Sequence, residues 1–418
     1  MHCDTPEALH VWLDSDGGPA CHIGTLTYDR RQIRLRYAPD WPTDVRAAFI
    51  HPGPSLGESS FSSKPTQRDL GILLDSSPDR WGRTLMRRCQ ALLASKDGRE
   101  ARRLSAWDYL IGVQDLTRQG ALRFCRPGSD TFLGDDARAA PPATSLPDLQ
   151  AAAIEWSRQG ADEPAALDPR FGVLAVAGAS LGGARPKASF MQPGGTLWLA
   201  KFPGVNDKRD IGAWEWVAHT LAARAGVDVP SSALLRLRGG FHTFCVQRFD
   251  RVAEKRRLYT SALAVLGKER GEDASYLELA QFLQARGDIR HKASDLEQLF
   301  RRVAFNVAIA NRDDHLRNHG FILGDAGWRL APAFDMNPSV DRSGHVLHID
   351  DADNRPDLGT VVSTAAFYGL SDERALFIIE SVVAVVGEWE NVARRAGIPA
   401  AEISPMRGAF ITVWCPKQ

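Results

Sequence analysis

The sequence predicts an α+β chain in which a sheet-rich N-terminal part precedes a mostly helical C-terminal part. Residues 9–40 alternate apolar and polar side chains and place glycines at the turns, a pattern typical of a small antiparallel sheet. Two further strand-like runs, residues 196–203 and 242–250, follow a glycine-rich stretch at residues 173–190. After Asp250 the apolar residues recur at helical spacing, which indicates that the rest of the chain is mainly helical.

Length and charge restrict the class of protein. A chain of 418 residues is too long for one compact core, so more than one domain is expected. The 51 Lys and Arg residues balance the 51 Asp and Glu residues, so no global charge favours nucleic acid or an anionic membrane. No apolar run approaches the roughly 20 residues that span a bilayer, and the start of the chain, MHCDTPEALH, lacks the features of a signal peptide. We therefore expect a cytoplasmic protein without a membrane anchor.

The cysteines bear on the redox compartment and on metal binding. The 6 cysteines lie far apart in the sequence, and no pair forms C-x-x-C. Scattered cysteines in a large chain are typical of free thiols in a reducing cytoplasm, and their spacing argues against structural zinc.

Two helices and a boundary are predicted in the first half of the chain. Residues 76–94, SSPDRWGRTLMRRCQALLA, have apolar side chains at helical spacing, with Ser77 or Asp79 as the cap. Residues 213–230 predict a second helix that ends near a glycine and a proline. Between them, residues 126–149 are rich in Pro, Gly, Asp and Ala and predict a domain boundary.

The second half contains a helix that should be buried nearly all round. In residues 296–310 apolar side chains occupy both sides of the predicted helix. This helix leads directly into the charged segment NRDDHLRN, which begins at Asn311. A hairpin is predicted at residues 320–335, and one long helix at residues 372–397.

The charged segment contains candidate residues for catalysis and metal binding. Asp313 and Asn318 form D-x-x-x-x-N, the spacing of a protein-kinase catalytic loop, in which the Asp accepts the substrate hydroxyl proton and the Asn holds Mg²⁺. Asp335, after the hairpin, is the natural second ligand, because Mg²⁺ prefers carboxylate and carbonyl oxygens. The alternative is a polar loop at a helix end, since this short motif is common by chance.

The glycine-rich stretch is a candidate phosphate loop. Gly178, Gly182 and Gly183 precede Lys187, and glycines let backbone amides approach phosphates closely. The stretch is not a Walker motif, and a plain turn is the alternative.

Two further residues fit a kinase in chain order. Lys201 lies in an apolar strand and is a candidate contact for the α- and β-phosphates, and Glu215 on the next helix is its candidate ion-pair partner. The alternative for both is a side chain that points to solvent. The order glycine loop, Lys, Glu, D-x-x-x-x-N and Asp is nevertheless the order of a kinase.

His315 and His319 raise the alternative of zinc. Zinc usually requires H-E-x-x-H and a third ligand, whereas this pair forms H-L-R-N-H. We therefore expect His315 to orient the catalytic loop.

In combination, these segments resemble the HipA-type kinases, the toxins of bacterial type II toxin–antitoxin systems. NRDDHLRNHGFIL and GWRLAPAFDMNPS are similar to their catalytic and metal-binding segments, VAGASLGGARPKASF to their phosphate loop, AKFP to their nucleotide-lysine strand and VQRFDR to their lobe-connecting segment. VWLDSDGGPACHIGTLTYD, SSPDRWGRTLM and DLTRQGALRF are similar to parts of their N-terminal domain. The similarity covers nearly the whole chain.

The resemblance implies a bilobal protein-kinase-like fold of the HipA type, with a small β-rich N-terminal domain and a mostly helical C-terminal lobe. The implied parts are an N-terminal domain at 1–125, a linker at 126–149, a kinase N-lobe at 150–252 and a kinase C-lobe at 253–418.

The resemblance also implies a Ser/Thr protein kinase that uses ATP and Mg²⁺. It makes Asp313 the catalytic base, with His315 beside it, and it makes Asn318 and Asp335 the Mg²⁺ ligands. The nucleotide-binding residues that it implies are Gly178, Ala179, Ser180, Gly182, Gly183, Lys187, Lys201, Gln247 and Phe249. The family's autophosphorylated serine corresponds to Ala175 here, so Ser180, inside the loop, is the candidate replacement.

The partners follow from the same resemblance. They are a HipB-like helix-turn-helix antitoxin, operator DNA reached only through that antitoxin, and a phosphorylated translation protein such as an aminoacyl-tRNA synthetase. Two other hypotheses stay open: a catalytically weak kinase-like scaffold that binds an antitoxin, and a metal hydrolase built on Asp313, Asp314 and His315.

Overall fold

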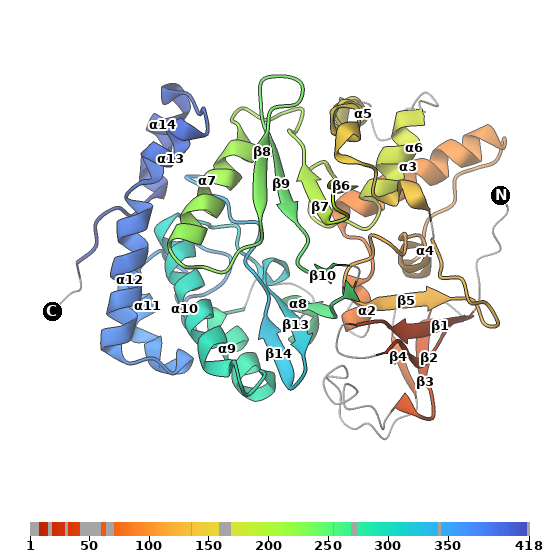
Figure 1. Cartoon of the computed structure of the whole chain (residues 1–418), viewed down its shortest axis with the longest axis horizontal. Coiled ribbons are helices and arrows are strands. Elements are labelled where there is room, and N and C mark those ends of the chain that lie inside the picture. Colours follow the sequence, from red (N-terminus) through yellow and green to blue (C-terminus); the bar gives the residue numbers. More distant parts are fainter. Residues whose placement is uncertain are drawn as a thin grey trace. The chain divides into compact units, whose positions relative to one another are not determined.

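A computed structural model describes most of the chain, and Figure 1 labels its helices and strands. The described residues are 8–15, 19–29, 32–41, 60–63, 71–134, 136–158, 169–253, 255–268, 274–341 and 344–415. They belong to two compact units, unit 1 (Met1–Asp207 and Arg236–Thr260) and unit 2 (Lys208–Leu235 and Ser261–Gln418). The predicted linker at 126–149 lies inside unit 1, and the four-part division expected from the sequence stays a prediction.

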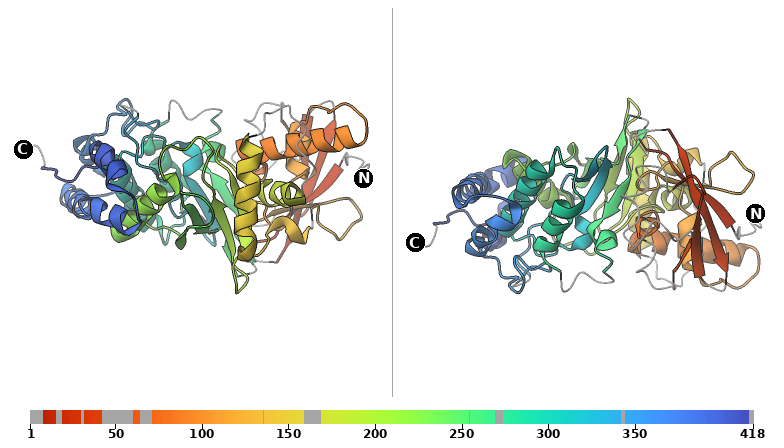
Figure 2. Two further views of the ribbon diagram at one scale, coloured as in Figure 1. Left: turned by 90° about the horizontal axis from the view of Figure 1, so that it is seen from above. Right: turned by 90° about the horizontal axis from the view of Figure 1, so that it is seen from below.

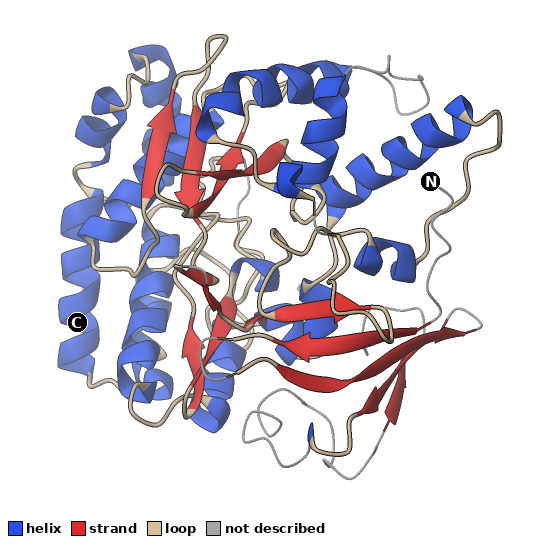
Figure 3. Cartoon of the chain, turned by 45° about the vertical axis from the view of Figure 1, so that its right-hand side comes forward, coloured by secondary structure: helices blue, strands red, loops and turns tan. Residues whose placement is uncertain are grey.

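Unit 1 contains a five-stranded antiparallel sheet, whose strands lie side by side in Figure 3. The strand order is β4-β3-β2-β1-β5, with β1 (Ala8–Leu13), β2 (Cys21–Asp29), β3 (Gln32–Tyr37), β4 (Ser60–Ser63) and β5 (Leu122–Cys125). In β1 the buried Leu9, Val11 and Leu13 alternate with half-buried neighbours, as a one-sided sheet requires. The predicted N-terminal antiparallel sheet is therefore confirmed.

The helices of unit 1 include the one predicted at 76–94. It is α3 (Arg80–Lys96), with Asp79 at its N-cap position and with Trp81 and Leu85 buried. The other helical segments are α2 (Ile72–Asp75), α4 (Ala106–Ile111), η3 (Ala137–Ala139), η4 (Ala143–Ser145), α5 (Leu146–Arg158) and α6 (Pro169–Gly178). The glycine-rich stretch thus begins as a helix, because the apolar run before Gly178 is buried on α6.

A second antiparallel group of strands follows the glycine-rich loop in unit 1. It contains β6 (Lys187–Met191), β7 (Leu197–Lys201) and β9 (Thr243–Gln247), and β7 lies between the other two. A small hairpin, β10 (Arg251–Val252) and β11 (Lys255–Arg256), comes next. The strands predicted at 196–203 and 242–250 are confirmed as β7 and β9. β12 (Tyr259–Ser261) lies at the boundary between the units.

Unit 2 is mainly helical, and its helices are grouped together in both views of Figure 2. Its segments are α7 (Ile211–Arg224), β8 (Ser232–Leu235), α8 (Ala262–Val265), α9 (Tyr276–Arg286), α10 (Lys292–Ala308), η5 (Leu316–Asn318), β13 (Gly320–Gly324), β14 (Gly327–Leu330), α11 (Leu358–Ser363), η6 (Ala365–Tyr368), α12 (Asp372–Val386), α13 (Trp389–Arg395), α14 (Ala400–Met406) and η7 (Arg407–Ala409). The predicted helix at 213–230 is α7, which ends before Gly226 with φ +76°.

α10 contains the helix predicted to be buried nearly all round, and its second half is buried on every side from Arg302 to Ala308, whereas Ala293 and Ser294 near its start are exposed. Phe300, Val303 and Val307 are fully buried, and so is Phe305 on the opposite side. α10 also buries two polar residues, Arg302 and Asn306. The hairpin predicted after it is β13 and β14, which pair in antiparallel fashion.

The single C-terminal helix predicted at 372–397 is wrong. The chain forms α12 and α13 instead, with Gly387 after the last residue of α12. Glycine weakens a helix interior, and the break lets Trp389 stack on Phe410 at a ring-centroid distance of 4.2 Å. Trp389 also contacts Trp214 of α7, so the break places this ring in the core of unit 2.

The sequence predicts no membrane-spanning segment and free cysteine thiols. Within the residues that the structure describes, no helix is long and apolar enough to cross a membrane. The described cysteines, Cys21, Cys89, Cys125, Cys245 and Cys415, are all free thiols, as expected.

Candidate functional site

The glycine loop, residues 179–186, connects α6 to β6 in unit 1. Its carbonyl groups are bound by the start of α3: the Trp81 amide donates to the Gly183 oxygen at 2.8 Å, and the Gly82 amide donates to the Leu181 oxygen at 3.2 Å. Gly183 has φ +70°, in the left-handed region. Within the described residues, the amides of Gly182, Gly183 and Ala184 donate to no protein acceptor. Successive unpaired amides beside a left-handed residue form a concavity suited to anions.

Two buried lysines lie beside this loop. Lys187 and Lys201 face each other across β6 and β7, and opposite residues of paired strands share a face of the sheet. They are only 7% and 8% exposed, so the alternative that Lys201 points to solvent is wrong. A methyl group at Gly183 would lie 2.7 Å from the Lys187 Nζ, which places that ammonium against the loop. The two side chains thus place two ammonium groups on one face of the sheet, next to the glycine loop.

Ser180 and Ala179 are buried in the glycine loop. Ser180 is 6% exposed, and its hydroxyl has no hydrogen-bond partner among the described residues. A buried hydroxyl without a partner is uncommon in proteins. Because the hydroxyl is buried in this conformation, autophosphorylation of Ser180 would require the loop to move, and the assignment stays a prediction.

Gln247 and Phe249, which the family resemblance places near the adenine, lie at the end of β9 and just beyond it. Gln247 pairs with Trp198 in the sheet, and Phe249 contacts the Tyr259 ring at 5.8 Å. Both side chains are half-buried. The nucleotide contact itself stays a prediction.

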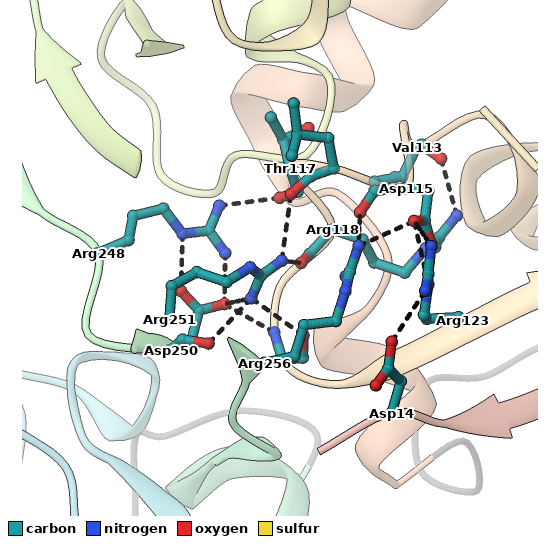
Figure 4. Close-up of polar contacts among 12 residues, drawn as sticks. Asp14, Val113, Asp115, Thr117, Arg118, Arg123, Arg248, Asp250, Arg251 and Arg256 are labelled. Carbon is teal, nitrogen blue, oxygen red and sulfur yellow. Dashed lines mark hydrogen bonds and ion pairs between the residues drawn. The ribbon is translucent and has the colours of Figure 1, made fainter. Parts of the chain in front are cut away.

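The segment after Gln247 is fixed by buried charges, which Figure 4 shows. The Arg248 guanidinium donates to both carboxylate oxygens of Asp250, at 2.8 and 2.5 Å, and to the Thr117 oxygen at 2.8 Å. Arg251 donates to Asp250 and to the carbonyls of Arg118 and Gly120. Burial alone would raise the pKa of Asp250, but the two guanidinium groups hold it well below its usual range.

The same network extends to Asp115. Arg256 donates to the Asp115 carboxylate at 2.8 Å, and Arg123 of β5 donates to it at 2.6 Å. We call Arg248, Asp250, Arg251, Arg256 and Asp115 the connector network. It joins the motifs VQRFDR and DLTRQGALRF, and this contact was not expected from the sequence.

In unit 2 the charged segment begins directly after α10. Ala310 has φ +50°, which is strained for a residue with a side chain. The Asn311 side chain donates to Asn306 at 3.1 Å and accepts from the Asn337 amide at 3.1 Å. The Ser339 amide also donates to the Ala310 oxygen at 3.0 Å. The turn at 310–311 therefore holds the segment that follows Asp335.

Asp313 and Asn318 occupy the ends of a tight turn. Asp313 is exposed, whereas Asn318 is 7% exposed. The Asn318 amide donates to the His315 oxygen at 2.8 Å, and its side chain donates to the Asp313 oxygen at 3.5 Å. Asp313 therefore lies at the exposed side of this turn, and the role of the Asn318 Oδ1 as a metal ligand stays a prediction. Asp335 has φ +60° and is half-buried.

Asp314, which the sequence suggested only as part of a metal hydrolase site, has a structural role that was not predicted. Its Oδ2 accepts from the Tyr276 hydroxyl at 2.5 Å and from Asn306 at 2.8 Å, and it lies 2.7 Å from the His319 Nε2. Burial would raise the pKa of Asp314, but His319 and the donated hydrogen bonds lower it. Burial and then the Asp314 charge raise the pKa of Tyr276 well above its ordinary value, so the hydroxyl remains a donor. The doubled Asp in NRDDHLRN was the available signal.

This arrangement bears on the metal hydrolase hypothesis. The Asp314 carboxylate is fully buried and is occupied by three protein groups, so it does not face a substrate. His319 is bound to Asp314. In the part of the chain that the structure describes, no three His, Cys, Asp or Glu side chains are grouped to hold a metal ion.

Glu215 is buried on α7, at 4% exposure, so the alternative of a solvated glutamate is wrong. Lys201 belongs to unit 1 and Glu215 to unit 2. Their pairing stays a prediction.

Known proteins are similar to this chain in sequence and fold. A protein from Haemophilus influenzae described as "Putative kinase" is 27% identical over 129 residues, and "Putative kinase Y4dM" from Sinorhizobium fredii is 25% identical over 161 residues. The matched segments cover 27% and 35% of this chain but only 36% and 38% of those two relatives.

Structural similarity extends much further. The HipA chain in a solved complex of HipA, HipB and operator DNA from Shewanella oneidensis MR-1 covers 96% of this chain, with 94% of its own length. The TM-score is 0.63 at 15% identity, which shows a shared fold. The predicted α+β, HipA-like fold is therefore confirmed. The model of the HipA-like C-terminal domain matches residues 179–389, half of the sequence, and the chain belongs to this family.

Proposed function

We propose that the chain is an ATP- and Mg²⁺-dependent Ser/Thr protein kinase that acts as the toxin of a type II toxin–antitoxin module. The end of α10 supports this most strongly. The last turns of α10, buried from Arg302 to Ala308, lead to the exposed carboxylate of Asp313, and the turn at 310–311 also holds the segment of Asp335. Phosphoryl transfer depends largely on positioning, and a buried helix provides a rigid base for it.

Each unit supplies groups that suit part of a magnesium nucleotide. The amides of Gly182, Gly183 and Ala184, which donate to no acceptor among the described residues, suit phosphate oxygens, and the ammonium groups of Lys187 and Lys201 lie on one buried face beside them. Asp335 and the Asn318 Oδ1 are oxygen donors of the kind that Mg²⁺ prefers. When it is bound, ATP supplies the γ-phosphoryl group.

The reaction needs one proton acceptor from the protein. The substrate hydroxyl oxygen forms a bond to the γ-phosphorus while the bond to the ADP oxygen breaks, and that oxygen keeps the electron pair. Asp313 accepts the hydroxyl proton, which contributes roughly 10²–10⁴-fold to the rate. His315 closes the turn through its carbonyl group, and Asp314 anchors the loop through Tyr276 and Asn306.

The toxin role and the partners rest on family similarity. The Shewanella HipA is solved together with HipB and operator DNA, which supports a HipB-like helix-turn-helix antitoxin as the partner of this chain. Balanced Lys, Arg, Asp and Glu counts favour operator binding through the antitoxin. The substrate is then a translation protein such as an aminoacyl-tRNA synthetase.

Induced expression in bacteria tests this proposal. Wild-type protein should arrest growth, and co-expression of the cognate antitoxin should restore it. Asp313→Ala should be soluble and harmless, whereas Asp325→Ala, in the exposed hairpin turn, should remain toxic. Growth arrest by soluble Asp313→Ala protein would refute a kinase toxin and favour a scaffold that acts by binding.

A further inference from the structure

The start of α3 makes an unusually close contact with the glycine loop. α3 begins within the motif SSPDRWGRTLM, residues 76–86. The proposed kinase activity assigns no role to this motif. We propose that its first turn, Trp81 and Gly82, positions the glycine loop for ATP phosphates. This inference rests on the proposed function and adds two positioning residues to it.

Three hydrogen bonds connect the start of α3 to the glycine loop and the strand that follows it. The first amides of a helix have no partner within the helix. Here the amides of Trp81 and Gly82 donate to the oxygens of Gly183 and Leu181, and the Trp81 Nε1 donates to the Lys187 oxygen at 2.8 Å. Helix α3 thus holds three carbonyl groups along the loop. These carbonyls are turned to α3, and the amides of residues 182–184 donate to no acceptor in the described part of the chain, so they can bind an anion.

The start of α3 also packs closely against the backbone of the glycine loop. A Cβ added at Gly82 would lie 2.4 Å from the Ala179 oxygen, and backbone cannot move away as a flexible side chain would. A Cβ added at Gly178 would lie 2.5 Å from the Leu85 Cδ1 and 3.0 Å from the Trp81 Nε1. The contact therefore needs glycine at position 82 and is tight at Gly178, and Trp81 is only 5% exposed within it.

Lys187 connects this contact to the charges of the site. Its carbonyl oxygen accepts from the Trp81 indole, and its ammonium lies against Gly183. Loss of the indole donor would release the backbone at the point where the loop enters β6. The expected consequence is weaker binding of phosphates, with the catalytic loop of unit 2 unchanged.

Two substitutions have matched controls in the same unit. Gly82→Ala inserts a methyl group against the loop, whereas Gly172→Ala on α6 meets no atom within 4 Å. Trp81→Phe removes a bound indole N–H, whereas Trp156→Phe removes one that has no partner among the described residues. If Gly82→Ala does not fold, Trp81→Phe, which keeps an aromatic ring, carries the test.

The experiment measures KM for ATP and kcat of phosphate transfer, together with calorimetric titration of Mg²⁺-ATP, on the full chain. Trp81→Phe and Gly82→Ala should raise KM and Kd for ATP by about tenfold with kcat nearly unchanged, because uniform binding is lost. The two controls should stay near wild type, whatever their effect on Tm. The positioning role would be overturned if KM and Kd for ATP were unchanged in both test variants. It would also be overturned if the controls changed as much as the test variants, or if the test variants had a higher kcat than wild type. A wild-type protein that binds no Mg²⁺-ATP would instead overturn the proposed function itself.

Discussion

The connector network should contribute strongly to the stability of unit 1, and Asp250 is the residue to perturb. Its carboxylate accepts two hydrogen bonds from Arg248, one from Arg251 at 2.8 Å and one from the Gly120 amide at 2.8 Å. All of these groups are largely buried, so solvent screening is weak. Asp250→Asn keeps the shape of the side chain but leaves two guanidinium groups without their counter-charge.

The magnitude follows from the cost of breaking a buried ion pair. Removal of one partner costs about 3–5 kcal/mol, because the other charge stays buried. Asp250→Asn retains an acceptor and should lie near the lower end, and Asp250→Ala near the upper end. Asp97→Asn is the matched control, since Asp97 pairs with Arg99 at the same sequence spacing but both side chains are exposed. An exposed pair is worth at most about 1 kcal/mol.

Urea unfolding followed by tryptophan fluorescence measures these differences. The loss of unfolding free energy at acid pH provides a second test. The folded-state pKa of Asp250 is lowered, so its contribution is present above the unfolded pKa of about 3.9 and is lost as pH falls below it. Wild type should therefore lose more stability on acidification than Asp250→Asn. An unfolding free energy of Asp250→Asn within about 1 kcal/mol of Asp97→Asn would refute the reasoning.

Three further predictions follow. Asp314→Asn should lower kcat for phosphate transfer by at least about tenfold and destabilise the fold by roughly 3 kcal/mol, because Asp314 anchors the loop that carries Asp313. Enzyme kinetics and urea unfolding measure the two effects, and wild-type values of both would contradict this role. Asp335→Gly should abolish transfer and lower Tm less than Asp335→Ala does, because glycine accepts φ +60° whereas alanine is strained there, and equal losses of Tm in the two variants would contradict this. Of the cysteines that the structure describes, Cys415 should react first with a thiol reagent, whereas Cys245, whose pKa burial raises to about 12, should react only on unfolding, as mass spectrometry would show.

Local patterns predicted much of the fold. The alternation in residues 9–40 reflects a sheet with one buried face, and the apolar residues around α10 reflect a helix surrounded by core. D-x-x-x-x-N located the exposed Asp313, because a short turn at the end of a helix is set by adjacent residues. Such features depend on neighbours in the sequence, so the sequence alone was sufficient for them.

Contacts between distant segments were not predictable in this way. Trp81 bonds to Lys187 across 106 positions, and Tyr276 bonds to Asp314 across 38. No period or motif links such pairs before the chain is folded. The break at Gly387 was missed for a related reason: it is favoured by the stacking of Trp389 on Phe410, which only the tertiary fold creates.

The most direct test of the central claim is the transfer of γ-labelled phosphate from Mg²⁺-ATP by purified protein. Wild type should label itself or a protein in a lysate on serine or threonine, and phosphosite mapping should show whether Ser180 is one of the sites. Asp313→Ala should lose this activity while it retains the Tm of wild type and its affinity for Mg²⁺-ATP. Equal labelling by wild type and Asp313→Ala would contradict the assignment of the catalytic base and, with it, the proposed kinase mechanism.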